Sequence, residues 1–243
     1  MFSILKKEIN SFLFSLIGFI VVLVFLVTNG LFIWVLPDTN LFDNGYATLD
    51  TLFNIAPFLF LFLVPAITMK SFAEEKKSGT IELLFTKPIK DIEIVLGKYF
   101  ACILLVLISL LPTLIYYISV YYLGNPVGNI DSAGFFGSFL GLFLLGSVFV
   151  SIGVFCSSIT DNQIVAFILS LIFSYLFYQG FDLLSGIAEK GSLTILISQF
   201  GIQYHYLSFS KGLIDSRDLI YFLSIILFFV FATRLKLESR NWQ

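Results

Sequence analysis

The chain has 243 residues, of which 58% are apolar and only 12% are charged, and its formal net charge is −2. Soluble domains carry about 25% charged residues, so sixteen acidic and fourteen basic side chains cannot cover so apolar a chain in water. This composition excludes a water-soluble globular enzyme and indicates a protein whose solvent is lipid. The sequence shows no strongly basic face, so we expect no nucleic-acid partner.

Six apolar segments are candidates for membrane-spanning helices, each of which needs about 20 residues at about 1.5 Å per residue. They cover residues 12–36, 52–69, 99–123, 134–157, 164–181 and 219–233. The last segment is short, so we expect it to extend into its flanks. Pro57, Pro65 and Pro112 are expected to kink the second and third spans. The sequence therefore predicts one all-α, polytopic membrane domain over residues 1–243.

The start of the chain also resembles a signal peptide, because Lys6 and Lys7 precede an apolar run. However, the run is longer than the apolar region of a signal peptide, and no small-residue cleavage site follows it. We therefore interpret the first segment as an uncleaved span.

The lysine and arginine residues predict which ends of the spans lie inside the cell. If the N-terminus is inside, the inner segments hold eleven of the fourteen bases, namely Lys6, Lys7, Lys70, Lys76, Lys77, Lys87, Lys90, Lys98, Arg234, Lys236 and Arg240. The outer loops hold Lys190, Lys211 and Arg217. This bias fits the positive-inside rule. Both termini and the inner loop, residues 70–98, are therefore predicted to be cytoplasmic.

The outer loop between the fifth and sixth spans, residues 182–218, has an apolar middle at residues 193–202 that is too short to cross a membrane. We expect a re-entrant or interfacial hairpin, which must be shielded by protein where it enters the membrane. His205 lies in this loop between Tyr204 and Tyr206. We interpret it as part of an interfacial aromatic belt, with proton sensing or substrate contact as the alternative.

The fourth span is rich in glycine, and Gly137 and Gly141 have the small-xxx-small spacing that lets two helices approach closely. This pair predicts either packing within the bundle or contact with a helix of a partner subunit.

The sequence lacks the residues that catalysis, metal binding or ion coupling would need. Cys102 and Cys156 lie in apolar runs and are expected to pack as small hydrophobic side chains. A single histidine cannot build a multi-histidine zinc site, and no G-x-x-x-x-G-K-[ST] motif is present to bind ATP. The six predicted spans contain no ionisable side chain, which disfavours an ion-driven carrier and an intramembrane protease. We therefore expect no catalytic residue, cofactor or metal site.

The inner loop carries the most informative pattern. Gly79 and Pro88 bracket a short segment in which Ile81, Leu84 and Phe85 recur at helical spacing, and Thr80 is a plausible N-cap. This pattern predicts a short amphipathic helix. Its apolar face is expected to lie either against the protein's own helix ends or lipid, or in a groove of a soluble partner.

The same loop resembles the cytoplasmic signature of permease subunits of ABC-2 type transporters. The stretch that carries the resemblance reads Glu74-Glu75-Lys76-Lys77-Ser78-Gly79-Thr80-Ile81-Glu82-Leu83-Leu84, followed by Pro88. In that family the loop forms a coupling helix on a separate ATPase subunit. The resemblance implies that Glu82 pairs with a base of the ATPase while Ile81, Leu84 and Phe85 fill its groove. The implied coupling residues are Gly79, Thr80, Ile81, Glu82, Leu83, Leu84, Phe85 and Pro88.

The resemblance extends to the N-terminal segment, which it implies is an amphipathic elbow helix lying in the membrane interface. Phe2, Leu5, Ile9 and Phe12 recur there at helical spacing. The family's extracellular re-entrant helices would correspond to residues 182–218. Within the family, the size, phenylalanine content and compact loops resemble the gliding-motility-associated permease subunits of bacteria that move over surfaces.

The partners that the resemblance implies are two copies of a cytoplasmic ATPase, a second permease subunit and membrane lipid. The permease subunit is identical to this one or carries a large extracytoplasmic part. The implied location is the bacterial inner membrane, and the implied substrate is a lipid, a polysaccharide or another large molecule. The alternative function is a membrane scaffold that assembles a complex without transport.

Overall fold

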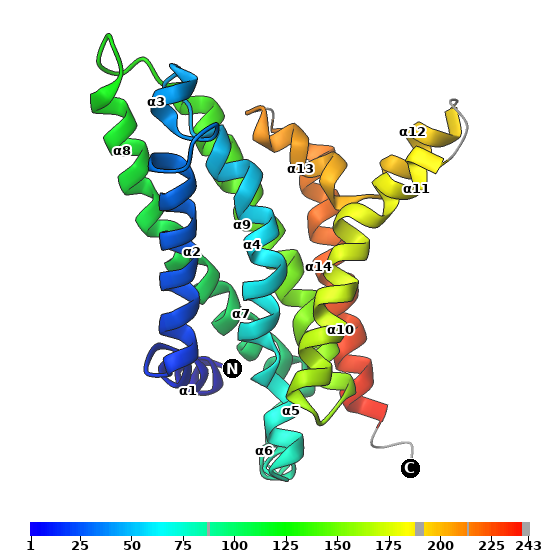
Figure 1. Cartoon of the computed structure of the whole chain (residues 1–243). Helices are drawn as coiled ribbons and strands as arrows, with labels where there is room; N and C mark the ends of the chain where they lie inside the picture. The colour runs from blue at the N-terminus through cyan, green and yellow to red at the C-terminus, as the bar shows by residue number, and fades with distance from the viewer. Residues whose placement is uncertain (87, 188–191, 213, 240–243) are drawn as a thin grey trace.

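The computed structural model describes residues 1–86, 88–187, 192–212 and 214–239, and the regular structure in these ranges is helical throughout (Figure 1). The α-helices are α1 (Phe2–Leu13), α2 (Leu16–Trp34), α3 (Leu41–Asn44), α4 (Asp50–Thr68), α5 (Lys70–Lys77), α6 (Ile81–Phe85), α7 (Asp91–Leu110), α8 (Leu114–Leu123), α9 (Ser132–Ile159), α10 (Gln163–Tyr175), α11 (Phe181–Ile187), α12 (Ser192–Ser198), α13 (Ile202–Ser210) and α14 (Ser216–Glu238). Three bases of the predicted charge bias, Lys87, Lys190 and Arg240, lie outside the described residues.

Within the described residues, six helices or helix runs are long and apolar enough to cross a membrane, one at each predicted position. They are Leu16–Trp34, Asp50–Lys77, Asp91–Leu123, Ser132–Ile159, Gln163–Gly186 and Ser216–Glu238. The predicted all-α fold with six spans is confirmed. The starts of the first and third spans differ most from the prediction: the first begins at Leu16, because Phe12 belongs to α1, and the third begins at Asp91 rather than Tyr99.

The prolines of the second and third spans have different effects. Helix α4 continues through Pro57 and Pro65, and its break comes later, at Met69, where α5 begins. The third span changes to a 3-10 turn at Leu111–Thr113, around Pro112, before it continues as α8. This turn lies at the predicted kink, since proline cannot donate the backbone hydrogen bond that an α-helix requires.

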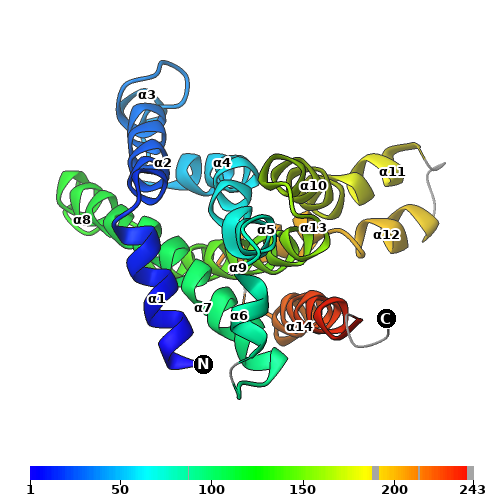
Figure 2. The ribbon, with the colours of Figure 1, turned by 90° about the horizontal axis from the view of Figure 1, so that it is seen from below.

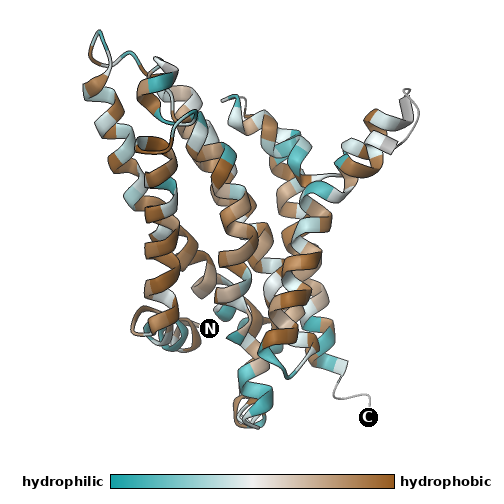
Figure 3. Ribbon diagram, viewed as in Figure 1, coloured by the Kyte–Doolittle hydropathy of each residue, from teal (hydrophilic) through white to brown (hydrophobic). Residues whose placement is uncertain are grey.

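Different elements lie at the two ends of the bundle (Figure 1). The N-terminus, α5, α6 and the end of α14 lie at one end, and α3 and the α11–α13 region lie at the other. The long helices are mainly apolar along their middle, whereas α5 is strongly polar (Figure 3). A six-span bundle with both ends on one side is the arrangement that the charge bias requires.

Helix α9 is the central helix of the bundle and packs on α4, α7, α10, α13 and α14 (Figure 2). Its glycines make room for these neighbours. A Cβ on Gly137 would lie 3.0 Å from the Cα of Gly212, and a Cβ on Gly141 would lie 3.0 Å from the Cγ of Phe209. The small-xxx-small pair therefore packs against α13 and its end, within the chain, which is the first of the two alternatives that the sequence left open.

The segment between the fifth and sixth spans contains helices too short to cross a membrane. Helices α11 and α12 pack side by side and project from the bundle (Figure 1). Helix α13 instead packs on α9 and buries Ile202, Tyr206 and Phe209. Residues 188–191 and 213, which belong to the predicted hairpin 182–218, lie outside the described residues.

His205 of α13 joins this segment to α14. Its ring stacks on Tyr221 at a centroid distance of 3.8 Å, as the aromatic-belt interpretation suggests. Its Nδ1 lies 2.6 Å from Oδ1 of Asp218, and its Nε2 lies 2.8 Å from the carbonyl oxygen of Gln199. The histidine is therefore also a polar tether, which the sequence pattern did not indicate.

Candidate functional site

The predicted coupling loop forms two short helices at the end of the bundle that holds the N-terminus. Helix α5 follows the break at Met69, and the chain turns into α6 at Gly79, whose φ of 70° lies in the left-handed region that favours glycine. Thr80 precedes α6 as predicted but makes no capping hydrogen bond; its hydroxyl lies 2.8 Å from that of Ser78. Gly79 therefore sets the direction of α6.

The apolar face of α6 lies against the protein itself. Ile81, Leu84 and Phe85 are half-buried and pack on the hydrophobic core, whereas Glu82 is exposed and Leu83 is 66% exposed. These three side chains, for which the resemblance implied contact with a partner groove, thus already contact the protein's own core. The most exposed side chains of α6 are Glu82 and Leu83. Helix α6 ends at Phe85, ahead of Pro88.

Helix α5 is anchored on α9 at the break in the second span. A helix break leaves backbone groups without partners, and such groups must be satisfied when they are buried. The Ser157 hydroxyl accepts hydrogen bonds from the backbone N–H groups of Phe72 at 3.0 Å and Ala73 at 3.1 Å. It donates to the carbonyl oxygen of Met69 at 3.0 Å. One serine of α9 thus fixes both sides of the break.

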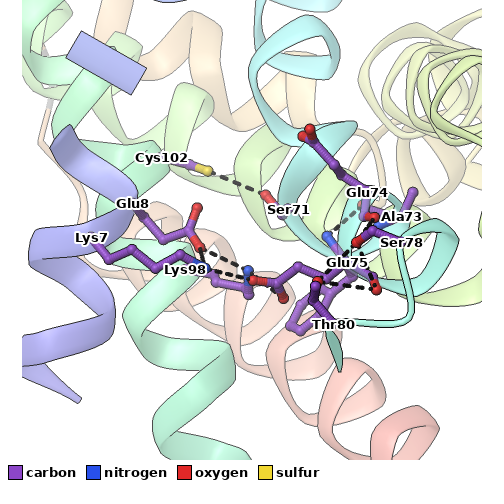
Figure 4. A network of polar contacts seen from close by, with 12 residues as sticks. Lys7, Glu8, Ser71, Ala73, Glu74, Glu75, Ser78, Thr80, Lys98 and Cys102 are labelled. Carbon is purple, nitrogen blue, oxygen red and sulfur yellow. Dashed lines mark hydrogen bonds and ion pairs between the residues drawn. The ribbon is translucent and has the colours of Figure 1, made fainter. Parts of the chain in front are cut away.

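A buried cluster of charges connects α1, α5 and α7 (Figure 4). The Nζ of Lys98 lies 2.9 Å from Glu8 Oε1, to which it donates a hydrogen bond, and 2.9 Å from Glu75 Oε2, in an ion pair without hydrogen-bond alignment. Lys7 adds a second base, with its Nζ 3.0 Å from Glu75 Oε1. We call Lys7, Glu8, Glu75 and Lys98 the charge cluster.

Burial makes the charge cluster expensive to break. The Lys98 side chain is 1% exposed, and the two carboxylate side chains are 11% exposed. Removing one partner of a buried ion pair leaves an uncompensated charge, which costs about 3–5 kcal/mol. Partial burial lowers the pKa of Lys7, but the hydrogen bond and charge of Glu75, with the charges of Glu8 and Glu74, outweigh this effect and raise it. Lys7 is therefore held in its charged form at neutral pH.

Sequence reasoning missed this cluster because it assigned Lys98 to the inner loop. The helix of the third span begins earlier than predicted, at Asp91, so Lys98 lies two turns inside α7 rather than in the loop before it. Asp91 and Glu93 supplied a signal, because acidic residues favour the first turn of a helix. With α7 begun at Asp91, Lys98 belongs to the third span.

Helix α1 lies across the end of the bundle, roughly perpendicular to the long helices, as an elbow helix would (Figure 2). Its buried face is Ile4, Glu8 and Phe12, while Phe2 of the predicted apolar stripe is 82% exposed. Gly97 allows the close approach of α1 to α7, since a Cβ there would lie 3.1 Å from a methyl carbon of Ile4. The spacing of Ile4, Glu8 and Phe12, one helical turn apart, could have indicated that Glu8 points inward.

Cys102 and Cys156 are buried and free, in agreement with the packing role predicted from the sequence. Cys102 Sγ lies 3.6 Å from the Ser71 hydroxyl, beside the charge cluster (Figure 4). The described residues contain no group of three or more His, Cys, Asp or Glu side chains that could hold a metal ion.

Comparison with protein families gives a match over nearly the whole chain. Residues 2–233 match the family described as ABC-2 family transporter protein. The chain belongs to this family. The match includes α1, the α5–α6 loop and all six candidate spans apart from the last residues of α14. A search of curated proteins gives no significant match. The ABC-2 resemblance that the inner loop suggested is thus confirmed at the level of the family.

Proposed function

We propose that this ABC-2 family protein is the permease subunit of an ATP-driven transporter and that α6 contacts a separate ATPase subunit. The observation that carries this proposal is the position of α6. It lies beyond the long helices at the end that holds the N-terminus, and it exposes Glu82 beside Leu83 (Figure 1). A carboxylate next to an exposed leucine suits a partner groove with an apolar wall and a basic rim.

In this proposal each part of the loop has a distinct role. Gly79 sets the direction of α6, Glu82 pairs with a base of the ATPase, and Leu83 enters its groove. Ile81, Leu84 and Phe85 hold the helix against the permease, and Thr80 is its N-cap residue. Pro88 prevents the helix from continuing. Movement of the ATPase is then passed to the spans through α5.

The proposed assembly follows from what the chain lacks. The sequence contains no P-loop motif, so ATP hydrolysis is assigned to the partner. We propose two copies of the ATPase and a second permease subunit, identical or different, in the bacterial inner membrane with both termini cytoplasmic. The family resemblance, the thirty phenylalanines and the short loops further support a role in gliding motility. Deletion in a gliding host would then abolish colony spreading.

The experiment that tests this function is ATP turnover by the purified complex of permease and ATPase. Glu82→Ala and Leu83→Asp are expected to abolish permease-stimulated turnover while the variants remain folded and inserted. Glu74→Ala is the matched control, because Glu74 is an exposed glutamate on the adjacent α5. Leu84→Asp is expected to destabilise the protein itself, since Leu84 packs on the core.

Two other outcomes would count against the proposal. Unchanged turnover in Glu82→Ala and Leu83→Asp would exclude α6 as the contact with the ATPase. The alternative, a non-transporting scaffold, predicts that these changes abolish assembly without altering the turnover of complexes that do form. Co-purification of the two subunits, measured alongside turnover, separates this alternative from coupling.

A further inference from the structure

The charge cluster joins three segments that are far apart in the sequence. Glu8 lies in α1 before the first candidate span, Glu75 lies in α5 at the end of the second, and Lys98 lies in α7, with 90 positions between Glu8 and Lys98. Each segment lies at the end of the bundle from which α6 projects (Figure 1). The cluster is therefore the place where forces on the α5–α6 loop can reach the first and third spans.

Burial determines how the cluster responds to such a force. In a medium of low dielectric constant, separating Lys98 from either carboxylate leaves unpaired charges that water cannot solvate. An apolar contact can slide at little cost, but a buried ion pair cannot. Helices α1, α5 and α7 are consequently expected to move as one body at this end of the bundle.

Glu75 holds the central position in this arrangement. It contacts Lys98 of α7 through Oε2 and Lys7 of α1 through Oε1, and it is the cluster residue on the helix that leads to α6. The neighbouring Glu74 is exposed and points away from the cluster (Figure 4). The two adjacent glutamates of α5 thus differ in burial and in ion pairing.

We propose that Glu75 is a positioning residue that passes a displacement of α6 to the first and third spans through Lys98 and Lys7. This inference rests on the proposed function, because the displacement itself comes from the ATPase. In this inference the movement of α6 reaches the first and third spans through the ion pairs, and not only the second span through the continuity of α4 and α5. Without Glu75, the movement of α6 would reach the second span and stop there.

The test measures movement at two places in the assembled complex with its ATPase. Paired spin labels on cysteines at Asn10 of α1 and Asn129, and at Thr86 beside α6 and Asn129, report ATP-dependent distance changes. These positions are exposed, while the native Cys102 and Cys156 are buried and do not compete for label. Both distances are expected to change in the wild type and in Glu74→Gln.

In Glu75→Gln the Thr86–Asn129 distance is expected to change with ATP and the Asn10–Asn129 distance to remain fixed. Stimulated turnover should fall about tenfold, within the usual range of coupling free energies. Glu75→Gln/Lys98→Gln removes one acid and one base together and leaves Glu8 beside Lys7, whose Nζ lies 4.0 Å from Glu8 Oε1, so it serves if the single change prevents folding. The same loss of α1 movement is expected there.

A change of the Asn10–Asn129 distance in Glu75→Gln equal to that of the wild type would overturn the inference and leave the proposed function intact. A Thr86–Asn129 distance that does not respond to ATP in the wild type would instead overturn the proposed function, and this inference with it.

Discussion

The hydroxyl of Tyr206 donates a hydrogen bond of 2.6 Å to the backbone carbonyl of Phe53, which lies in another helix of the bundle. The carbonyl is free because Pro57, four residues later, has no N–H to donate. In a membrane an unsatisfied backbone group is costly, and neighbouring helices commonly satisfy it. Burial, with the nearby Tyr178, holds the pKa of Tyr206 well above its usual value of 10.0, so the phenol remains a donor.

This relationship predicts a specific coupling between two substitutions. Tyr206→Phe is expected to lower the free energy of unfolding by about 1 kcal/mol, because it leaves the Phe53 carbonyl without a partner. In a Pro57→Ala background the loss should be smaller, since position 57 then donates the missing bond. Thermal unfolding of the wild type, the two single variants and the double variant in detergent measures this coupling. Equal losses of unfolding free energy in both backgrounds would contradict this account.

Ser157 is expected to contribute more to the stability of the fold than other serines of the bundle. Ser157→Ala removes the partner of the Phe72 and Ala73 N–H groups and of the Met69 carbonyl at the break between α4 and α5. We expect a loss of about 2 kcal/mol in unfolding free energy. Ser119→Ala is the control, because that exposed hydroxyl only bonds to a carbonyl of its own helix. Similar unfolding temperatures for the two variants would show that the break does not need Ser157.

Gly153 is predicted to be the least replaceable glycine of α9. A Cβ there would lie 2.8 Å from the Cβ of Thr68 in α4, closer than real side chains approach, and even closer to the Thr68 hydroxyl. Gly153→Ala should therefore separate two buried helices and cost about 1–3 kcal/mol. Gly186→Ala, with no atom within 4 Å of the new methyl group, should leave stability unchanged. Thr68→Ala in the Gly153→Ala protein should restore part of the loss if this contact is the cause.

The span count and the short helix of the inner loop were predictable, because both are local patterns of hydrophobicity and helix-breaking residues. The charge cluster was not. Glu8, Glu75 and Lys98 come from three segments, and they meet only because α1 packs on α7 and α5 packs on α9. The orientation of α6 likewise depends on which neighbour covers Ile81, Leu84 and Phe85. The sequence left two alternatives, and within the chain itself these side chains pack on the protein's own core.

The same reasoning explains Gly137 and Gly141. Their spacing predicted close helix contact, but the sequence does not encode which helix approaches. The structure places α13 and Gly212 there, so this face of α9 is already occupied within the chain.

The remaining prediction concerns orientation across the membrane. Cysteines at Ser78, after α5, and at Asn129, between α8 and α9, would lie on opposite sides, because one full span separates the two exposed positions. The excess of lysine and arginine on the segments predicted to be inside predicts that Ser78 lies in the cytoplasm. A membrane-impermeant maleimide added to intact cells should therefore label the Asn129→Cys protein and label Ser78→Cys only after lysis. The buried Cys102 and Cys156 should give little background in either case. The opposite labelling pattern would invert the orientation and place α6 on the side where no ATP is available to a partner.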